Sequence, residues 1–165
     1  MIALYSARAI YHYYPGDTNS GGVKRRLRKM DHSMIYVLIA GSYTPVVLRY
    51  MDAPDSYVFL AVIWGIALFG IGAKLLWIDA PRFLGTILYL LMGWAVVFRF
   101  DVVLAMPAPA IALLAAGGLA YTVGGVIYIL KKPNLSAVVG FHELFHLFVL
   151  AGSLCHYLMV FLYVL

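Results

Sequence analysis

The sequence predicts an all-α integral membrane protein, a polytopic bundle of helices, from three observations. Of its 165 residues, 64% are hydrophobic and only 12% are charged, whereas soluble domains carry about 45–50% apolar and about 25% charged residues. Apolar segments close to the ~20 residues that cross a bilayer alternate with connectors that contain Pro, Gly or charged residues. Runs such as 61–71 are apolar on every side, whereas a membrane β-strand alternates apolar and polar residues. A water-soluble globule and a disordered chain are therefore excluded.

Six apolar segments are predicted to span the membrane, and together they form one transmembrane domain over residues 1–165. In order they are 1–14, 33–48, 57–76, 83–104, 110–130 and 140–165. The first is short, but it has neither the basic start nor the small-residue cleavage site of a signal peptide. The single cysteine, Cys155, cannot form an internal disulfide, so a disulfide-stapled scaffold is not expected.

Local patterns predict how three of these helices bend, end and pack. Pro45 is expected to bend the second segment, with Ser42 and Thr44 satisfying the freed backbone groups. Arg99 and Asp101 are expected to mark the outer end of the fourth segment, where a long side chain can reach water. In the fifth segment small residues recur every four positions, which favours close approach of another helix. These residues are Ala112, Ala116, Ala120 and Gly124, flanked by Gly117, Gly118 and Gly125.

The positions of the basic residues predict the orientation of the bundle. The chain has 12 Lys and Arg against 7 Asp and Glu, a net charge of +5. Nine of the 12 fall in three connectors on one side: five in 13–32, then Lys74 with Arg82, and Lys131 with Lys132. The positive-inside rule places these connectors in the cytoplasm and the C-terminus outside. The basic charge is thus a topology signal, with attraction to anionic lipid head groups as a second effect, and no nucleic-acid partner is expected.

Ionisable side chains inside a span are costly and mark functional positions. His142 and His146 are four residues apart on the last predicted helix, about 40° apart around its axis, so their rings can converge on one ion. His12 ends the first segment at the same depth and can supply a third imidazole, the ligand count that leaves one zinc position open for water. Asp31 begins the second segment at that depth and could bind the ion or accept a proton from the metal-bound water. These four residues are the predicted zinc site.

Other interpretations of the same residues stay open at this point. Asp31 could instead cap a helix N-terminus or pair with Arg28. The sequence from His142 to His146 also matches the H-E-x-x-H pattern of metalloproteases, in which Glu143 would be the general base.

Two further histidines are not expected to bind the zinc ion. His32 points about 100° away from Asp31 and is expected to meet water or lipid head groups. His156 lies about 15 Å beyond His146 along the helix and is expected to be a hydrogen-bonded histidine near the outer leaflet.

Two long runs of the sequence resemble the bacterial hemolysin III family, which is related to the adiponectin and progestin receptors of animals. They are DHSMIYVLIAGSYTP at 31–45 and GFHELFHLFV at 140–149, and the resemblance covers essentially the whole chain, including 93–94 and 117–121. It implies a seven-helix protein of the bacterial cell membrane with a zinc ion near the cytoplasmic face. Members of the family have a further helix before the one that carries the first histidine, so this chain corresponds to the pattern without its first helix.

The resemblance also implies residue roles. His12, His142 and His146 would be the zinc ligands, and Asp31 would lie beside the metal-bound water. The family has a serine four residues before the first histidine, where this chain has Arg8. A guanidinium there would repel a metal dication unless it pairs with an acid such as Asp31.

Three functions are compatible with these features. The first is a zinc-dependent membrane hydrolase that cleaves lipid amides or esters, as the animal relatives suggest through ceramide cleavage. The second is a pore-forming cytolysin, as the family name suggests, although the spans offer almost no polar stripe to line a pore. The third is a receptor-like membrane protein in which zinc only holds helices together, which would require a fourth protein ligand. Membrane lipids are the expected partners in all three, and the sequence does not define the oligomeric state.

Overall fold

The described part of the chain consists of helices and connecting loops, without a strand. The structure is a computed structural model, and it describes residues 6, 22–76, 82–135 and 140–165. Its elements are α2 (Val23–Tyr50), α3 (Asp55–Leu76), α4 (Arg82–Gly93), the 3-10 helix η1 (Trp94–Arg99), α5 (Phe100–Leu104), α6 (Ala108–Leu130) and α7 (Phe141–Tyr163). The last four predicted segments match α3, the stretch α4–η1–α5, α6 and α7 to within two residues at either end, whereas the predicted segment 33–48 lies inside α2, which begins ten residues earlier. Of the first predicted segment, only residue 6 is described.

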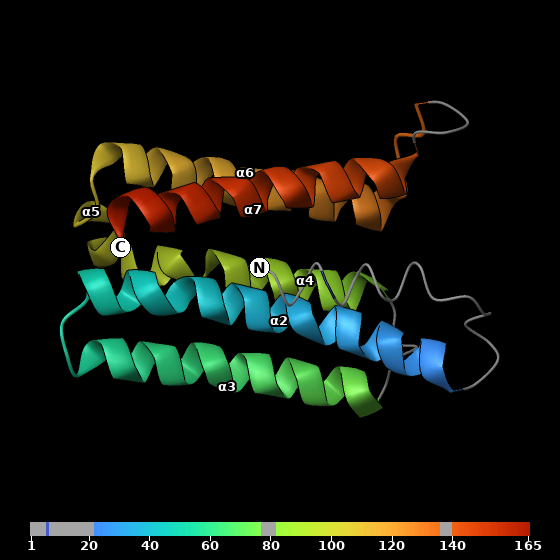
Figure 1. Ribbon diagram of the computed structural model, residues 1–165, viewed down its shortest axis with the longest axis horizontal. Coiled ribbons are helices and arrows are strands. Elements are labelled where there is room, and N and C mark those ends of the chain that lie inside the picture. Colours follow the sequence, from blue (N-terminus) through green and yellow to red (C-terminus); the bar gives the residue numbers. More distant parts are fainter. Residues whose placement is uncertain (1–5, 7–21, 77–81, 136–139) are drawn as a thin grey trace.

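Within the described residues, four helical stretches are long and apolar enough to cross a membrane. They are 55–76, 83–104, 108–130 and 141–163. The protein is therefore a multi-pass membrane protein, while the prediction of six spans is not confirmed. Helix α2 is not among these four, yet it runs through the bundle side by side with α3 (Figure 1).

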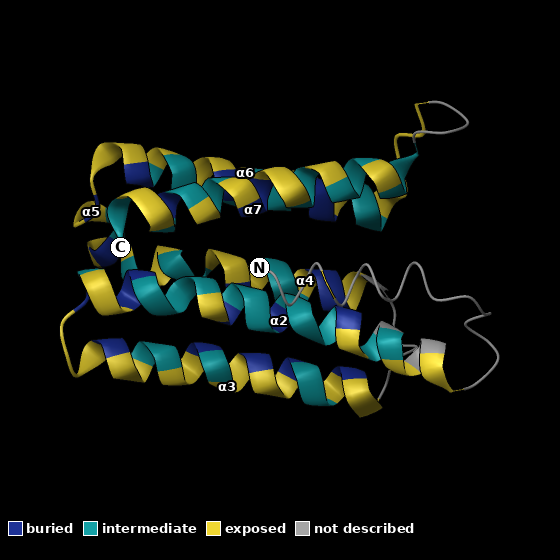
Figure 2. Ribbon diagram, in the orientation of Figure 1, coloured by how far each residue is buried: buried dark blue, intermediate teal, exposed yellow. Residues whose placement is uncertain are grey.

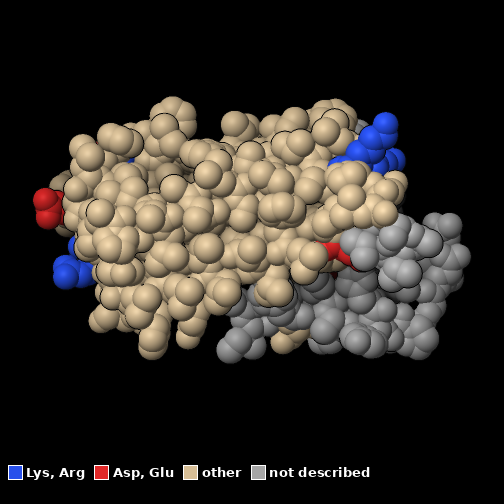
Figure 3. All heavy atoms as spheres, turned by 90° about the horizontal axis from the view of Figure 1, so that it is seen from above, with Lys and Arg blue, Asp and Glu red and all other residues tan. Residues whose placement is uncertain are grey.

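The helices run up and down along one long axis (Figure 1). Helices α6 and α7 form one closely packed pair and α2 and α3 another, while α4 contacts α2, α3 and α6. We call the end at which α2, α4 and α7 begin the basic end, because the run 24–29 and Lys131 with Lys132 lie there; the other is the far end. Charged side chains gather toward the two ends of the face in Figure 3, with an uncharged surface between them, as a membrane-spanning bundle requires.

Buried side chains form two clusters between the helices, and Figure 2 marks the buried residues in dark blue along the ribbon. One, toward the far end, joins α2, α5, α6 and α7 and comprises Val46, Val47, Met51, Val102, Met106, Ala110 and Met159. The other joins α2, α3 and α4 and comprises Tyr36, Ala40, Ile63, Ala67 and Met92. Large apolar side chains such as Phe69 and Phe98 are exposed on the outside, which is the surface that lipid would cover.

Glycines allow the close approach of α6 and α7. A Cβ at Gly117 would lie 3.2 Å from the carbonyl oxygen of Gly152, and a Cβ at Gly124 would lie 3.0 Å from Cβ of Phe148. In contrast, Ala112 and Ala116 of the predicted small-residue stripe are exposed. The prediction of a close helix contact is therefore confirmed, and the contact uses Gly117 and Gly124. The prediction that Ala112 and Ala116 belong to it was wrong.

The fourth predicted span is not a continuous α-helix. It consists of α4, η1 and α5, and Arg99 leaves helical geometry with φ −127° and ψ 59°. The hydroxyl of Tyr43 on α2 donates to the carbonyl of Gly93 at 2.7 Å and accepts the backbone N–H of Val96 at 3.0 Å. A single side chain therefore satisfies backbone groups on both sides of the change from α to 3-10 geometry, which lipid could not do.

At the far end, Arg99 joins two elements through carboxylates. Its Nε and Nη2 donate to Asp101 at 3.0 and 2.8 Å, and its Nη1 lies 3.3 Å from Asp55 Oδ2. This arrangement is consistent with the prediction that Arg99 and Asp101 mark a helix end. It ties the start of α3 to the end of the fourth span.

Helix α2 continues through Pro45 as far as Tyr50. Ser42 Oγ donates to the carbonyl of Ile39 at 2.8 Å, and Thr44 Oγ1 donates to the carbonyl of Ala40 at 3.0 Å. Both bonds go to carbonyls just before Gly41, whose carbonyl is the one that Pro45 leaves without its helical N–H partner, so these hydroxyls bond the backbone near the proline but do not satisfy the freed group as predicted.

The contact between Gly70 and Tyr36 provides a test of the packing of α2 on α3. A Cβ at Gly70 would lie 2.4 Å from the buried Tyr36 ring, whereas a Cβ at Gly72 on the same helix meets nothing within 4 Å. We expect Gly70→Ala to destabilise the fold by about 1–3 kcal/mol through overpacking, and Gly72→Ala to leave it unchanged or slightly more stable. Thermal unfolding in detergent measures the stability of both variants. Equal melting temperatures of the two variants would contradict the close packing of Gly70 against Tyr36.

Candidate functional site

A large cavity of about 770 Å³ lies between α2, the fourth span, α6 and α7, and we call it the central cavity. Asp31, His142 and His146 line it toward the basic end, and Val103, Ile111 and Met159 line it toward the far end. Between them its walls are mostly apolar side chains such as Leu38, Leu90, Leu114 and Val149. The cavity therefore combines ionisable groups at one end with an apolar interior, a combination typical of ligand sites.

His142 and His146 form a close pair in the first two turns of α7. Their Nε2 atoms are 3.1 Å apart, and the ring centroids are 4.5 Å apart with the planes at 85°. At this distance one Nε2–H can donate to the other Nε2. The sequence-based prediction that the two rings converge is consistent with this arrangement.

The same geometry fits a divalent metal. Two imidazole nitrogens on one tetrahedral zinc, each at about 2.1 Å, are about 3.4 Å apart, close to the observed 3.1 Å. Binding would require both Nε2 atoms to be deprotonated, so the ion would replace the shared proton. No third His, Cys, Asp or Glu joins the pair closely enough to complete a metal site within 22–76, 82–135 and 140–165. His12 and Arg8 lie outside the described residues, so the predicted third ligand stays a prediction.

Asp31 is buried, with 5% of its surface exposed. It lies in the interior of α2, which begins at Val23 with Gly22 as its N-cap residue. The alternative that Asp31 caps a helix N-terminus is therefore wrong. A buried carboxylate on the wall of the cavity that His142 and His146 also line favours a role in the site.

Glu143 has a structural role in α7. Its Oε2 accepts the backbone N–H of Gly140 at 2.9 Å, which caps the start of the helix. Asn134 Oδ1 accepts the next backbone N–H, that of Phe141, at 3.0 Å. The Glu143 side chain is exposed, and its carboxylate already accepts a hydrogen bond at the helix terminus. The geometry therefore does not favour the general-base role of the H-E-x-x-H pattern.

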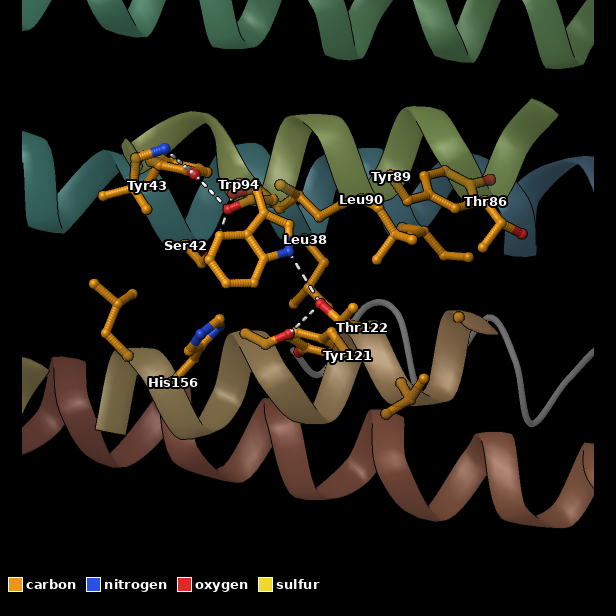
Figure 4. Close-up of a pocket in the computed structure, with 18 of the residues that line it drawn as sticks. Leu38, Ser42, Tyr43, Thr86, Tyr89, Leu90, Trp94, Tyr121, Thr122 and His156 are labelled. Atoms are coloured by element: carbon orange, nitrogen blue, oxygen red, sulfur yellow. Dashed lines mark hydrogen bonds between the residues drawn. The ribbon is translucent and has the colours of Figure 1, made fainter. Parts of the chain in front are cut away.

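The structure adds residues to the cavity that the sequence pattern did not indicate. His32, expected to meet water or head groups, lines the cavity, and its backbone carbonyl accepts the Tyr89 hydroxyl at 3.1 Å. Trp94 Nε1 donates to Thr122 Oγ1 at 3.0 Å across the cavity (Figure 4). No spacing on one helix could reveal this pair, because its members come from different spans.

His156 also lines the cavity, between α6 and α7. Its ring lies edge-on to Tyr121 with centroids 5.3 Å apart. Its buried Nε2 forms no hydrogen bond of ordinary geometry with any described residue. The ring therefore faces the interior of the bundle, and its expected depth near the outer leaflet stays a prediction.

These features define a class of protein: a polytopic helical membrane protein whose helices enclose an apolar cavity with an imidazole pair and a buried carboxylate at one end. The chain belongs to the hemolysin III family, which confirms the resemblance. The family model described as Haemolysin-III related matches residues 1–157.

Two relatives illustrate the membership. The chain is 34% identical over 164 residues to the Hemolysin-3 homolog of Bacillus subtilis, covering 99% of this chain and 73% of the relative. It is 34% identical over 166 residues to Hemolysin-3 of Bacillus cereus, covering 100% and 72%. No solved structure matches the chain.

Tyr43 tests how the wall of the cavity is held. In Tyr43→Phe the carbonyl of Gly93 and the N–H of Val96 lose their side-chain partner in an apolar surrounding, so we expect a loss of about 1–3 kcal/mol in stability. Thermal unfolding in detergent measures it. Tyr57→Phe, at a side chain that is 64% exposed, is the matched control and should melt like the wild type. A Tyr43→Phe variant as stable as Tyr57→Phe would show that these bonds do not hold η1.

Proposed function

We propose that this hemolysin III-family protein is a zinc-dependent hydrolase that cleaves amide or ester bonds of membrane lipids at the basic end of the bundle. The observation that carries the proposal is the Nε2 pair 3.1 Å apart on the wall of an apolar cavity that also contains buried Asp31. The positive-inside rule assigns this end to the cytoplasm and the C-terminus to the outside. A lipid could then place its polar head at the site and its apolar chain in the cavity.

The residues have separate tasks in this proposal. His142 and His146 would bind zinc as neutral imidazoles, and His12, which the family motif implies, would be the third ligand. Zinc with three protein ligands supplies a water of pKa near 7 and polarises a carbonyl oxygen. Asp31 would orient the attacking water and take its proton, which its burial beside the cavity supports. The apolar lining would exclude other water and hold the lipid chain.

Metal content is the first test. We expect the protein purified in mild detergent to contain close to one zinc per chain by elemental mass spectrometry, and His142→Ala and His12→Ala to lose it. His32→Ala is the matched control, because His32 lines the same cavity but lies outside the pair. A wild-type protein without zinc after purification from zinc-supplemented cells would contradict the proposal.

Turnover is the second test. Asp31→Asn keeps the size of the side chain but replaces one carboxylate oxygen with an NH2 group and cannot accept a proton, so we expect zinc to be retained and hydrolysis to fall about 10²–10⁴-fold. Product release from a panel of N-acyl amides and acyl esters, followed by mass spectrometry, measures it. Zinc-loaded wild-type protein that is inert against the whole panel would contradict the proposed hydrolase activity. The site would then be a metal site without catalysis.

Cytolysis is a second candidate, because both relatives carry the name Hemolysin-3. A water-filled pore needs a polar lining, whereas the central cavity is lined mainly by apolar side chains, which favours the hydrolase. Red-cell lysis that persists in His142→Ala would favour the cytolysin over the hydrolase. A purely structural zinc would use four protein ligands, and the described residues supply two of them.

A further inference from the structure

A second group of polar residues lines the central cavity far from the histidine pair. Ser42 comes from α2, Thr122 from α6 and His156 from α7, and we call these three residues the polar belt. His156 follows His146 by ten residues and Ser42 follows Asp31 by eleven, about 15 and 17 Å along parallel helices. Ser42 and His156 therefore lie at one depth, well separated from the proposed zinc site, and Thr122, five residues beyond the Gly117 that His156 contacts, lies about 8 Å nearer that site.

The hydroxyl hydrogens of the belt are already used within the protein. Ser42 Oγ donates to the carbonyl of Ile39 at 2.8 Å. Thr122 Oγ1 donates to the carbonyl of Gly118 at 2.7 Å and accepts from Trp94 Nε1 at 3.0 Å. A hydroxyl oxygen that has donated its only hydrogen can still accept one. Ser42 in particular offers the cavity an acceptor and no donor.

His156 adds a second acceptor. A Cβ at Gly117 would lie only 2.6 Å from Nε2, so this edge of the ring rests on the α6 backbone. The backbone of Leu114, one turn away on the same side of α6, also contacts the ring. A neutral imidazole with its N–H toward this backbone leaves Nδ1 as a bare acceptor. Because the ring lines the cavity, as Figure 4 shows, its edge away from Gly117 faces the interior.

An acceptor in an apolar cavity costs free energy unless a donor reaches it. Most of the other side chains that line the cavity are apolar, among them Leu38, Leu90, Val97, Leu114 and Val149, and the nearby donors of Tyr43 and Trp94 already bond to Gly93 and Thr122. The complementary ligand is therefore an apolar chain that carries one hydrogen-bond donor.

We propose that the polar belt is a binding site for a hydroxyl group carried partway along a lipid chain, with His156 as the acceptor of its single hydrogen and Ser42 in the same lining. The proposal deepens the proposed function, on which its choice of a lipid rests: the chain would run from the histidine pair through the cavity, with its hydroxyl about 15 Å from the head. The protein would thereby select mid-chain hydroxylated lipids over plain ones.

The experiment compares two eighteen-carbon fatty amides, one plain and one hydroxylated about two-thirds of the way along the chain, which in the extended form matches the depth of His156, about 15 Å from the head. Their dissociation constants are measured by calorimetry with detergent-purified protein in EDTA, so that neither zinc nor turnover contributes. For the wild type we expect about 5- to 10-fold tighter binding of the hydroxylated amide, the effect of one buried hydrogen bond. In His156→Phe, which keeps an aromatic ring but removes the acceptor, the ratio should fall to about one. The preference is the ratio of the two dissociation constants measured on the same variant. A change in the overall stability of a variant affects both constants and therefore does not change their ratio.

Further variants separate the possible outcomes. His156→Gln restores an acceptor and should recover part of the preference, and Tyr157→Phe, at the next residue but half-exposed on the outer surface, should keep all of it. The preference should also persist in His142→Ala, which separates this site from the zinc hydrolase. Equal affinity of the wild type for the two amides, as expected if only water occupies the belt, would overturn the proposal. An unchanged preference in His156→Phe, or failure of both amides to bind, would overturn it as well.

Discussion

The close contact of α6 with α7 determines where the chemistry of this protein lies. Gly117 and Gly152 bring the two backbones together, with a Cβ at Gly152 only 3.1 Å from the carbonyl oxygen of Gly117. At this separation the Tyr121 and Ser153 hydroxyls are 2.8 Å apart and the ring of His156 fits over Gly117. His142 and His146 belong to the same helix, so the packing that fixes His156 also fixes the direction and depth of the pair. The cavity forms on the open side of this helix pair, toward α2 and the fourth span.

The distribution of polar groups along the cavity follows from its membrane setting. Within hydrocarbon every donor needs a partner from the protein, and the hydroxyls of Ser42, Tyr43 and Thr122 each donate to a backbone carbonyl. The carboxylate and the imidazole pair lie near the basic end, where a charged or metal-bound species is less costly than at the midplane. The cavity thus separates a place for polar chemistry from a place for apolar binding.

The sequence predicts the helices well because membrane crossing imposes a length and a composition that hydropathy detects directly. It also places His142 and His146 together, because four residues make neighbours on any α-helix. It does not predict the break at 94–99, since that backbone depends on the Tyr43 hydroxyl of another helix. It also does not distinguish the lipid-facing Ala112 and Ala116 from the buried Gly117, because both positions lie in one small-residue pattern. The expected closeness of His12 to the pair concerns residues outside the described part of the chain.

The Tyr43 hydroxyl restricts how α2 and the fourth span can move relative to each other. Its two bonds, to Gly93 and Val96, lie at the start of η1, and the bond from the Tyr89 hydroxyl to the carbonyl of His32 joins the same two elements nearer the basic end. Sliding of either element along the other would break the bonds at both places. The two places together fix the register of α2 against the fourth span, so this wall of the cavity behaves as one unit.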